Sequence, residues 1–395
     1  DVTVTGNSRI EGDIEISSDK AGNRDLKFTL ESGMVTGSLV ASSGAEKVTV
    51  TKSSDVTLAA PDGYEWDDNG TLVCTYAAAF NGIGYETLEA AIAAAKVDTT
   101  KARTVTLLND CSGNGIMIEK DAFPNGLTVD FAGHTYTMNG TPVGSTGTET
   151  QAMHIEEGNK IILMSSAQNK GTFRADESIG SELMMLVQNY ADLTVKNMNL
   201  DGSEVSLSGE TFTLSSNNGT VVIDDSVLTP TAGNRTQVYA IGICGFASYA
   251  GTDVTITGNS QVNGKVRLIY DEAAVGTPQL GLKLESGSVK ELIVNSSAKQ
   301  FTVTKSAAFT VEKGTPTGYE WKDNGDGNLT LTPIAAVAEV NHHKGEFSSL
   351  EDALAAAADG DTITLLDDIS VSEQIVIDKK LTIMLSGKTL TSTYK

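Results

Sequence analysis

The chain has 395 residues, with 51 Asp and Glu against 28 Lys and Arg and a formal net charge of -23. Because such a charge repels phosphate backbones and anionic lipids, it argues against nucleic-acid binding. The longest uncharged apolar stretch, residues 238–250, is shorter than the roughly 20 residues that a membrane-spanning helix needs. The composition predicts a soluble, acidic, ordered protein.

The sequence repeats itself at a distance of about 255 residues, which indicates a duplicated module. Six segments return with few changes: 1–8 as 253–260, 30–33 as 284–287, 48–53 as 301–306, 63–66 as 318–321, 87–95 as 349–357 and 104–108 as 362–366. We therefore expect residues 1–78 to be the C-terminal part of one module, 79–333 a complete module and 334–395 the N-terminal part of the next. Since the chain opens in an alternating run without an initiator Met, we expect a processed or excised piece.

A Tyr-Glu-Trp segment followed by Asn-Gly occurs once per copy and predicts a β-hairpin, over residues 318–332 in the complete module. We expect this hairpin to close each module. Its anchoring residues are Tyr64, Trp66, Asn69 and Gly70, repeated as Tyr319, Trp321, Asn324 and Gly325. The two Trp are interpreted as packing residues, with a sugar-stacking role as the alternative.

A short amphipathic helix is predicted at residues 86–96 and again at 348–358. Its apolar stripes are Leu88, Ala91, Ile92 and Ala95 in the first copy, and Leu350, Ala353, Leu354 and Ala357 in the second. Ser348 and Glu351 predict a capping box. The helix precedes the first strands of the module, so we expect it to cap an exposed end of the strand stack.

Between helix and hairpin, short alternating strands recur at intervals of 28 to 34 residues. The positions that align are Val129, Leu163, Val195, Ile223, Ile256 and Leu284. Each strand runs into a cluster of Asn, Asp, Ser or Gly residues. Regularly spaced β-branched strands bounded by turn residues predict an all-β solenoid whose apolar residues point inward.

Comparison of the two copies indicates which positions the module retains. Exposed charges change between them: Arg9, Glu11 and Asp13 become Gln261, Asn263 and Lys265, Asp67 becomes Lys322, and His134 becomes Lys388. The apolar residues, the glycines and the Tyr/Trp pair remain. We therefore expect no catalytic site and no metal site in the duplicated part.

The unduplicated region, residues 140–252, leaves room for a site. Lys196, Asp201, Asp224, Asp225 and Arg235 lie near turns on successive coils and would suit a polysaccharide lyase if they converged on one face. Acidic residues are also common in solvated turns, and this interpretation is favoured. If the region held an enzyme, Asp224→Ala or Arg235→Ala would abolish its activity.

Other reactive side chains give weaker signals. Cys74 aligns with Leu331 and Cys111 with Ile369, so both are expected to be buried small hydrophobes; with Cys244 they make an odd number and predict no disulfide framework. The adjacent His342 and His343 point to opposite faces if extended. Residues 323–328 lack the ligand spacing of a calcium loop. No cofactor is expected, and calcium is not indicated.

Residues 127–137, together with 85–95 and 104–110, resemble the opening of right-handed parallel β-helix, pectin-lyase-like domains in large adhesin-like surface proteins of gut and other anaerobic bacteria. The resemblance covers nearly the whole chain as a fold pattern and implies a secreted, cell-surface or filament-forming protein built from tandem modules. Catalytic relatives of this fold carry clustered calcium-binding Asp with an Arg or Lys base, or paired Asp with Gly-His-Gly. Here residues 133–135 read Gly-His-Thr and their counterparts 387–389 read Gly-Lys-Thr, so the resemblance supports the fold and not the activity.

The leading hypothesis is a non-catalytic structural or adhesive rod, extracellular or at the cell surface. Its expected partners are neighbouring copies of its own module, stacked head to tail, and host glycans or proteins. One alternative is a polysaccharide lyase or glycoside hydrolase with its site in residues 140–252. Another is a glycan-binding module, which exposed rings of Trp66 or Trp321 would favour.

Overall fold

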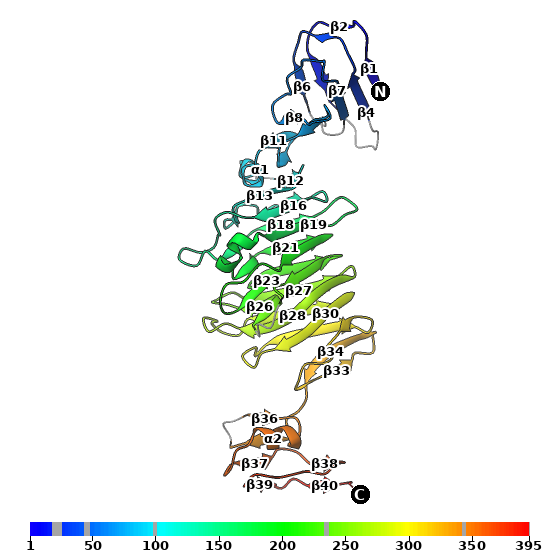
Figure 1. The fold of residues 1–395 in the computed structure, drawn as a ribbon. Helices are drawn as coiled ribbons and strands as arrows, with labels where there is room; N and C mark the ends of the chain where they lie inside the picture. Colours follow the sequence, from blue (N-terminus) through cyan, green and yellow to red (C-terminus); the bar gives the residue numbers. More distant parts are fainter. Residues whose placement is uncertain (18–25, 43–47, 98–100, 233–236, 342–344, 395) are drawn as a thin grey trace. The chain divides into compact units, whose positions relative to one another are not determined.

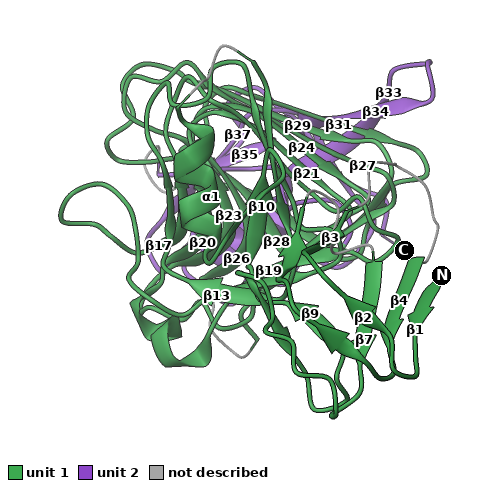
Figure 2. Cartoon of the chain, turned by 90° about the horizontal axis from the view of Figure 1, so that it is seen from above, with its two compact units in different colours: residues 1–313 green, residues 314–395 purple. Residues whose placement is uncertain are grey.

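The computed structural model describes residues 1–17, 26–42, 48–97, 101–232, 237–341 and 345–394. They form two compact units, residues 1–313 and 314–395, which Figure 2 shows in different colours. Strands dominate both units, as the predicted all-β class requires. The described helices are α1 (Leu88–Ala95), α2 (Leu350–Ala356) and the 3-10 helix η2 (Glu177–Glu182). None of them has the length and apolar character needed to cross a membrane.

Three rows of parallel strands build the main body of unit 1, and from residue 103 to residue 245 each turn of the chain adds one strand to each row (Figure 1). The first row contains β12 (Arg103–Leu107), β15 (Leu127–Asp130), β18 (Lys160–Met164), β21 (Asp192–Lys196), β24 (Gly219–Asp224), β27 (Gly251–Thr257), β29 (Gln279–Leu284) and β31 (Phe301–Ser306). Every neighbouring pair in this row is parallel.

The other two rows merge at one long strand, β28 (Ser260–Tyr270), into a single 13-stranded sheet. One row contains β13 (Cys111–Gly113), β16 (Thr135–Met138), β19 (Gly171–Ala175), β22 (Met198–Gly202) and β25 (Val227–Pro230). The other contains β14 (Ile116–Ile118), β17 (Gln151–Ile155), β20 (Met185–Asn189), β23 (Thr211–Ser216) and β26 (Val238–Gly245). Beyond β28, the sheet continues with β30 (Gly287–Val294) and β32 (Thr310–Val311).

The predicted alignment of the coils is confirmed residue by residue in the first row. Consecutive members of the aligned series are Cα partners in register: Val129, Leu163, Val195, Ile223, Ile256 and Leu284. All six are at most 1% exposed, so they form one continuous apolar stack. Removing each such side chain from water contributes about 1.5–3 kcal/mol to folding.

The polar residues after these strands form the corners of the coils. Ala132, Asn197, Asp225 and Asn259 each follow a first-row strand and have φ between 44° and 60°. Asn and Asp tolerate this left-handed conformation better than most residues because their short side chains bond to nearby backbone. The predicted turn clusters are therefore the places where the backbone changes direction.

Helix α1 and an antiparallel hairpin lie at the first coil. The hairpin strands β10 (Ala78–Phe80) and β11 (Ile83–Tyr85) pair with each other, and β10 also pairs with β12. The predicted stripe is confirmed, since Leu88, Ala91, Ile92 and Ala95 are the buried residues of α1. Thr87 caps the helix by accepting a hydrogen bond from the Ala90 amide at 3.1 Å.

Residues 1–76 contain three short rows of strands around a core of their own. The rows are β1 (Val2–Val4), β4 (Leu26–Leu30) and β7 (Val48–Lys52); β2 (Arg9–Ile10) and β5 (Met34–Val35); and β3 (Ile14–Ile16) and β6 (Leu39–Ala41). An antiparallel hairpin of β8 (Tyr64–Trp66) and β9 (Leu72–Cys74) follows them.

Unit 2 begins with the second copy of the hairpin, β33 (Tyr319–Asp323) and β34 (Asn328–Pro333). Then follow β35 (Ala338–Val340), β36 (Glu346–Phe347), α2, β37 (Thr362–Leu365), β38 (Ile369–Val371), β39 (Thr382–Met384) and β40 (Leu390–Ser392). β35 pairs antiparallel with β36 and β37, and β37 pairs parallel with β39, as β10 pairs with β11 and β12 and as β12 pairs with β15. The repeated sequences thus adopt the same order of elements, while the predicted boundaries after residues 78 and 333 stay predictions.

Both hairpins form where Asn-Gly predicts them. Gly70 has φ of +74°, and a Cβ atom there would lie 2.1 Å from the Lys52 carbonyl oxygen, so only glycine fits. The half-buried Trp66 packs on the core of residues 1–76, and its indole Nε1 donates to the Leu58 carbonyl at 2.9 Å. The Lys52 ammonium lies 5.3 Å from the centre of the Trp66 ring. Trp321 is also half-buried.

Two predicted details are wrong. The N-cap of α2 is Ser349, whose hydroxyl accepts from the Asp352 amide at 3.1 Å, so the cap lies one residue after the predicted Ser348 and Glu351. Leu350 is buried and Leu354 is half-buried in this helix. Cys74 pairs with Tyr64, and Pro333 takes the same place opposite Tyr319, because the strands of the second hairpin are longer. Leu331 is therefore not the counterpart of Cys74.

Candidate functional site

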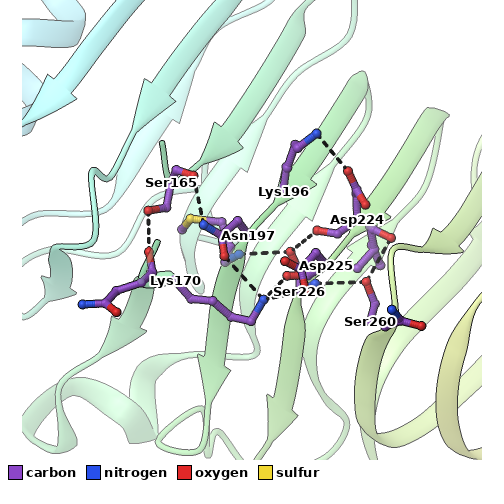
Figure 3. A network of polar contacts seen from close by, with 12 residues as sticks. Ser165, Lys170, Lys196, Asn197, Asp224, Asp225, Ser226 and Ser260 are labelled. Carbon is purple, nitrogen blue, oxygen red and sulfur yellow. Dashed lines mark hydrogen bonds and ion pairs between the residues drawn. The ribbon is translucent and has the colours of Figure 1, made fainter. Parts of the chain in front are cut away.

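Three of the predicted acidic-site residues lie in a polar network at the corners after β21 and β24 (Figure 3). Lys196 forms an ion pair with Asp224 at 3.2 Å, and Lys170 forms one with Asp225 at 3.0 Å. Asn197 donates to the carbonyls of Ser165 and Ala167 at 3.1 and 2.8 Å. Each carboxylate thus has its own lysine, and the network ties successive coils together.

Buried serines extend this network into the stack. The Ser226 hydroxyl donates to the Asp224 carbonyl at 2.8 Å, and the Ser226 amide donates to the Ser260 hydroxyl at 3.0 Å. Ser226 and Ser260 are 1% and 0% exposed. Because a buried polar group costs stability unless it is bonded, these contacts are what a structural corner requires.

Asp201 lies elsewhere, on β22, where its register neighbour is Arg174 of β19. Both line a groove of about 480 Å³ together with Asp110, Thr137 and Thr172. The Arg174 Nε donates to the Thr137 hydroxyl at 3.0 Å. Of the five predicted residues, three lie at the corner and Asp201 lies in this groove, while Arg235 lies outside the described residues.

The other candidate ligands remain separate. Asp323 and Asp326 each accept a bond from a nearby backbone amide, at 2.8 and 2.9 Å, as turn residues do. His134 lies 3.4 Å from the Asp110 carboxylate on the surface. His342 and His343 are outside the described residues. Within the described ranges, no group of three or more His, Cys, Asp or Glu side chains is placed to hold a metal ion.

The three cysteines are half-buried, where full burial was expected for Cys74 and Cys111, and no disulfide joins them. Burial raises the pKa of Cys111 to about 11, and the carboxylates of Glu89 and Asp110 add to the effect. Burial and Asp271 raise the pKa of Cys244 to about 11. Both thiols are therefore protonated at neutral pH and poor nucleophiles.

We expect Cys111 and Cys244 to react with iodoacetamide at pH 8 roughly 100-fold more slowly in the folded chain than in urea, because the thiolate is the reacting form. Peptide mass spectrometry of timed samples measures the two rates separately. Equal rates in the folded and unfolded chain would contradict the assigned environments.

A small aromatic pocket lies where strands of the 13-stranded sheet end. It is not among the sites predicted from the sequence. It has a volume of about 180 Å³ and is lined by Lys120, Ser145, His154, Glu156, Glu157, Tyr190, Phe246 and Tyr249. His154 is on β17, Tyr190 follows β20, and Phe246 and Tyr249 follow β26. The pocket thus collects side chains from coils that are far apart in sequence but stacked in space.

Buried amides fix the walls of this pocket. Gln188 and Asn217 donate to the Tyr190 hydroxyl at 3.0 and 3.1 Å, and Ser215 donates to Asn217 at 2.9 Å. Asn159 holds the turn after β17: its side chain accepts from the Phe123 amide at 2.7 Å and donates to the carbonyl of Glu156 at 2.8 Å. These hydrogen bonds hold the walls of the pocket in place.

A signal for this pocket is present in the sequence. Tyr190, Phe246 and Tyr249 occupy turn positions in the unduplicated region, where other coils carry small or polar residues.

Comparison with protein-family models, with curated proteins and with solved structures finds no match for this chain.

Proposed function

We propose that this chain is part of a right-handed parallel β-helix, pectin-lyase-like surface protein that acts as a rigid structural and adhesive rod, outside the cell or on its surface, without catalysis. The observation that carries the proposal is the duplication itself, because the two copies keep the apolar stack, the turn glycines and the Tyr/Trp hairpin while their exposed charges change. A scaffold needs only its core and its corners to be retained.

The register of the coils supports the same function. Successive strands add to the first row at about 4.8 Å each, the spacing of hydrogen-bonded strands. In such a stack each coil contacts only its neighbours, so modules can be added in tandem. Neighbouring copies of the module, host glycans and host proteins are the proposed partners.

The charge fits a rod of this kind. Ion pairs such as Lys196–Asp224 and Lys283–Glu285 lie along exposed corners and strands and contribute little stability each. The excess of carboxylates, from which the net charge of -23 arises, keeps such rods soluble and apart.

A depolymerisation assay on neutral and acidic polysaccharides tests the proposal against the enzymatic alternative. We expect no release of reducing ends or of unsaturated products above the buffer control. Product release that is abolished by Asp224→Ala in the corner network, or by Arg174→Ala in the groove beside Asp201, would overturn the proposal.

A further inference from the structure

We propose that the aromatic pocket lined by His154, Tyr190, Phe246 and Tyr249 binds one uncharged hexopyranose ring, as presented at the end of a glycan. The inference deepens the proposed function, on which it rests, because it gives the rod a chemically defined contact. It begins from a buried group that lines the pocket and of which one ring nitrogen has no hydrogen-bond partner.

His154 is that group. The residue is 2% exposed, and its Nδ1 atom is buried without a hydrogen-bond partner. Burial lowers the pKa of His154, although Glu156 and Gln188 act in the opposite direction, so the ring is neutral at pH 7. A buried polar atom without a partner costs stability. A sugar hydroxyl satisfies either tautomer of a neutral imidazole, since it both donates and accepts.

The aromatic rings beside His154 suit the C–H face of a sugar ring. The Tyr190 ring lies 5.5 Å from that of His154, 6.0 Å from Phe246 and 5.3 Å from Tyr249, measured between ring centres. A pyranose has a C–H face that packs on aromatic rings and a rim of hydroxyls that needs polar partners. Pockets that combine aromatic walls with a few fixed polar groups are typical small-molecule sites.

The size and rigidity of the pocket support a single ring. Its volume of about 180 Å³ is close to the engineered cavity of about 150 Å³ that admits benzene. Tyr190 is held by Gln188 and Asn217, and the Tyr249 amide donates to the Phe246 carbonyl at 3.2 Å within one tight turn. Because these walls are already fixed, little ordering cost accompanies binding.

The charges at the rim disfavour an anionic ligand. Glu157 forms an ion pair with Lys120, and Glu156 accepts a bond from the Lys120 amide at 2.7 Å. The rim thus holds two carboxylates, those of Glu156 and Glu157, and a single ammonium, that of Lys120. It adds to the negative charge of a strongly acidic protein. Uronic and sialic acids are repelled there, whereas hydroxyls can donate to the carboxylate.

Calorimetric titration of the full chain tests the inference. The probes are the methyl glycosides of glucose, galactose, mannose and N-acetylglucosamine, with glucuronic acid and choline as charged comparisons. We expect at least one neutral glycoside to bind with a Kd on the order of 1 mM, as a ligand of so few atoms typically gives. Tyr249→Ala should weaken that binding at least about tenfold, while Tyr249→Phe, which keeps the ring, should weaken it less.

Tyr394→Ala is the matched control, since it removes an exposed Tyr far from the pocket in sequence. It should leave the Kd unchanged, and circular dichroism should show that all variants are folded. The inference is overturned if no neutral glycoside binds, if choline or glucuronic acid binds in their place, or if Tyr249→Ala leaves the Kd unchanged. None of these outcomes affects the rod, because the depolymerisation assay and electron microscopy test the proposed function separately.

Discussion

Replacing Ile223 by Ala should lower the free energy of unfolding by about 2–5 kcal/mol, as truncation of a fully buried aliphatic side chain does. Ile223 is 0% exposed and lies between Val195 and Ile256 in the apolar stack. A cavity there faces the coils above and below, which are fixed by their own ladders and cannot collapse into it. Urea denaturation of the whole chain, followed by circular dichroism, measures the change.

Val222→Ala is the matched control because Val222 precedes Ile223 on the same strand and is only half-buried. Its substitution should cost less than about 1 kcal/mol, since surface positions away from special features tolerate change. Equal costs for the two variants would contradict the inward and outward alternation on which the stacked core depends.

Replacing Glu210 by Ala should cost about 3 kcal/mol, because it leaves a buried guanidinium without its counter-ion. Arg267 on β28 is 6% exposed, and its two terminal nitrogens lie 2.6 Å from the two oxygens of Glu210. Its guanidinium also lies 4.0 Å from the centre of the Tyr239 ring. Burial alone lowers the pKa of Arg267, but the hydrogen bonds and charge of Glu210 raise it overall.

The matched control is Glu285→Ala, which breaks the exposed ion pair with Lys283. It should cost at most about 1 kcal/mol, as solvent-exposed pairs do. Both variants are compared by the urea midpoint of the whole chain. If Glu210→Ala were as mild as Glu285→Ala, the pair of Arg267 and Glu210 would not be the buried support that its geometry indicates.

The coil stack could be predicted because its signal is local and repeated. First-row strands alternate apolar and polar residues, and four of them run into a non-glycine residue with positive φ. Aligning Val195 with Ile223 therefore needs no knowledge of the other rows. The hairpins and α1 follow from equally local signals: Asn-Gly, and the stripe from Leu88 to Ala95. The Cys74 alignment fails because four more residues separate Trp321 from its partner Leu331 than separate Trp66 from its partner Leu72, which shifts the pairing.

The candidate sites were harder to predict because they depend on which corners meet. In the sequence, Asp201, Asp224 and Asp225 all stand near predicted turns. In the structure, Asp201 lies within β22, whereas Asp224 and Asp225 lie at the end of β24 and pair with two different lysines. The aromatic pocket joins β17, β20 and β26, whose separation in sequence hides their proximity. The periodicity of the sequence does not indicate that residues on both faces of β17, which carries His154, are buried.

Electron microscopy of the native material tests the central claim most directly. The proposed function predicts straight rods whose averaged images carry an axial repeat of about 4.8 Å, the rise of one coil. Globular particles without this repeat would contradict the rod.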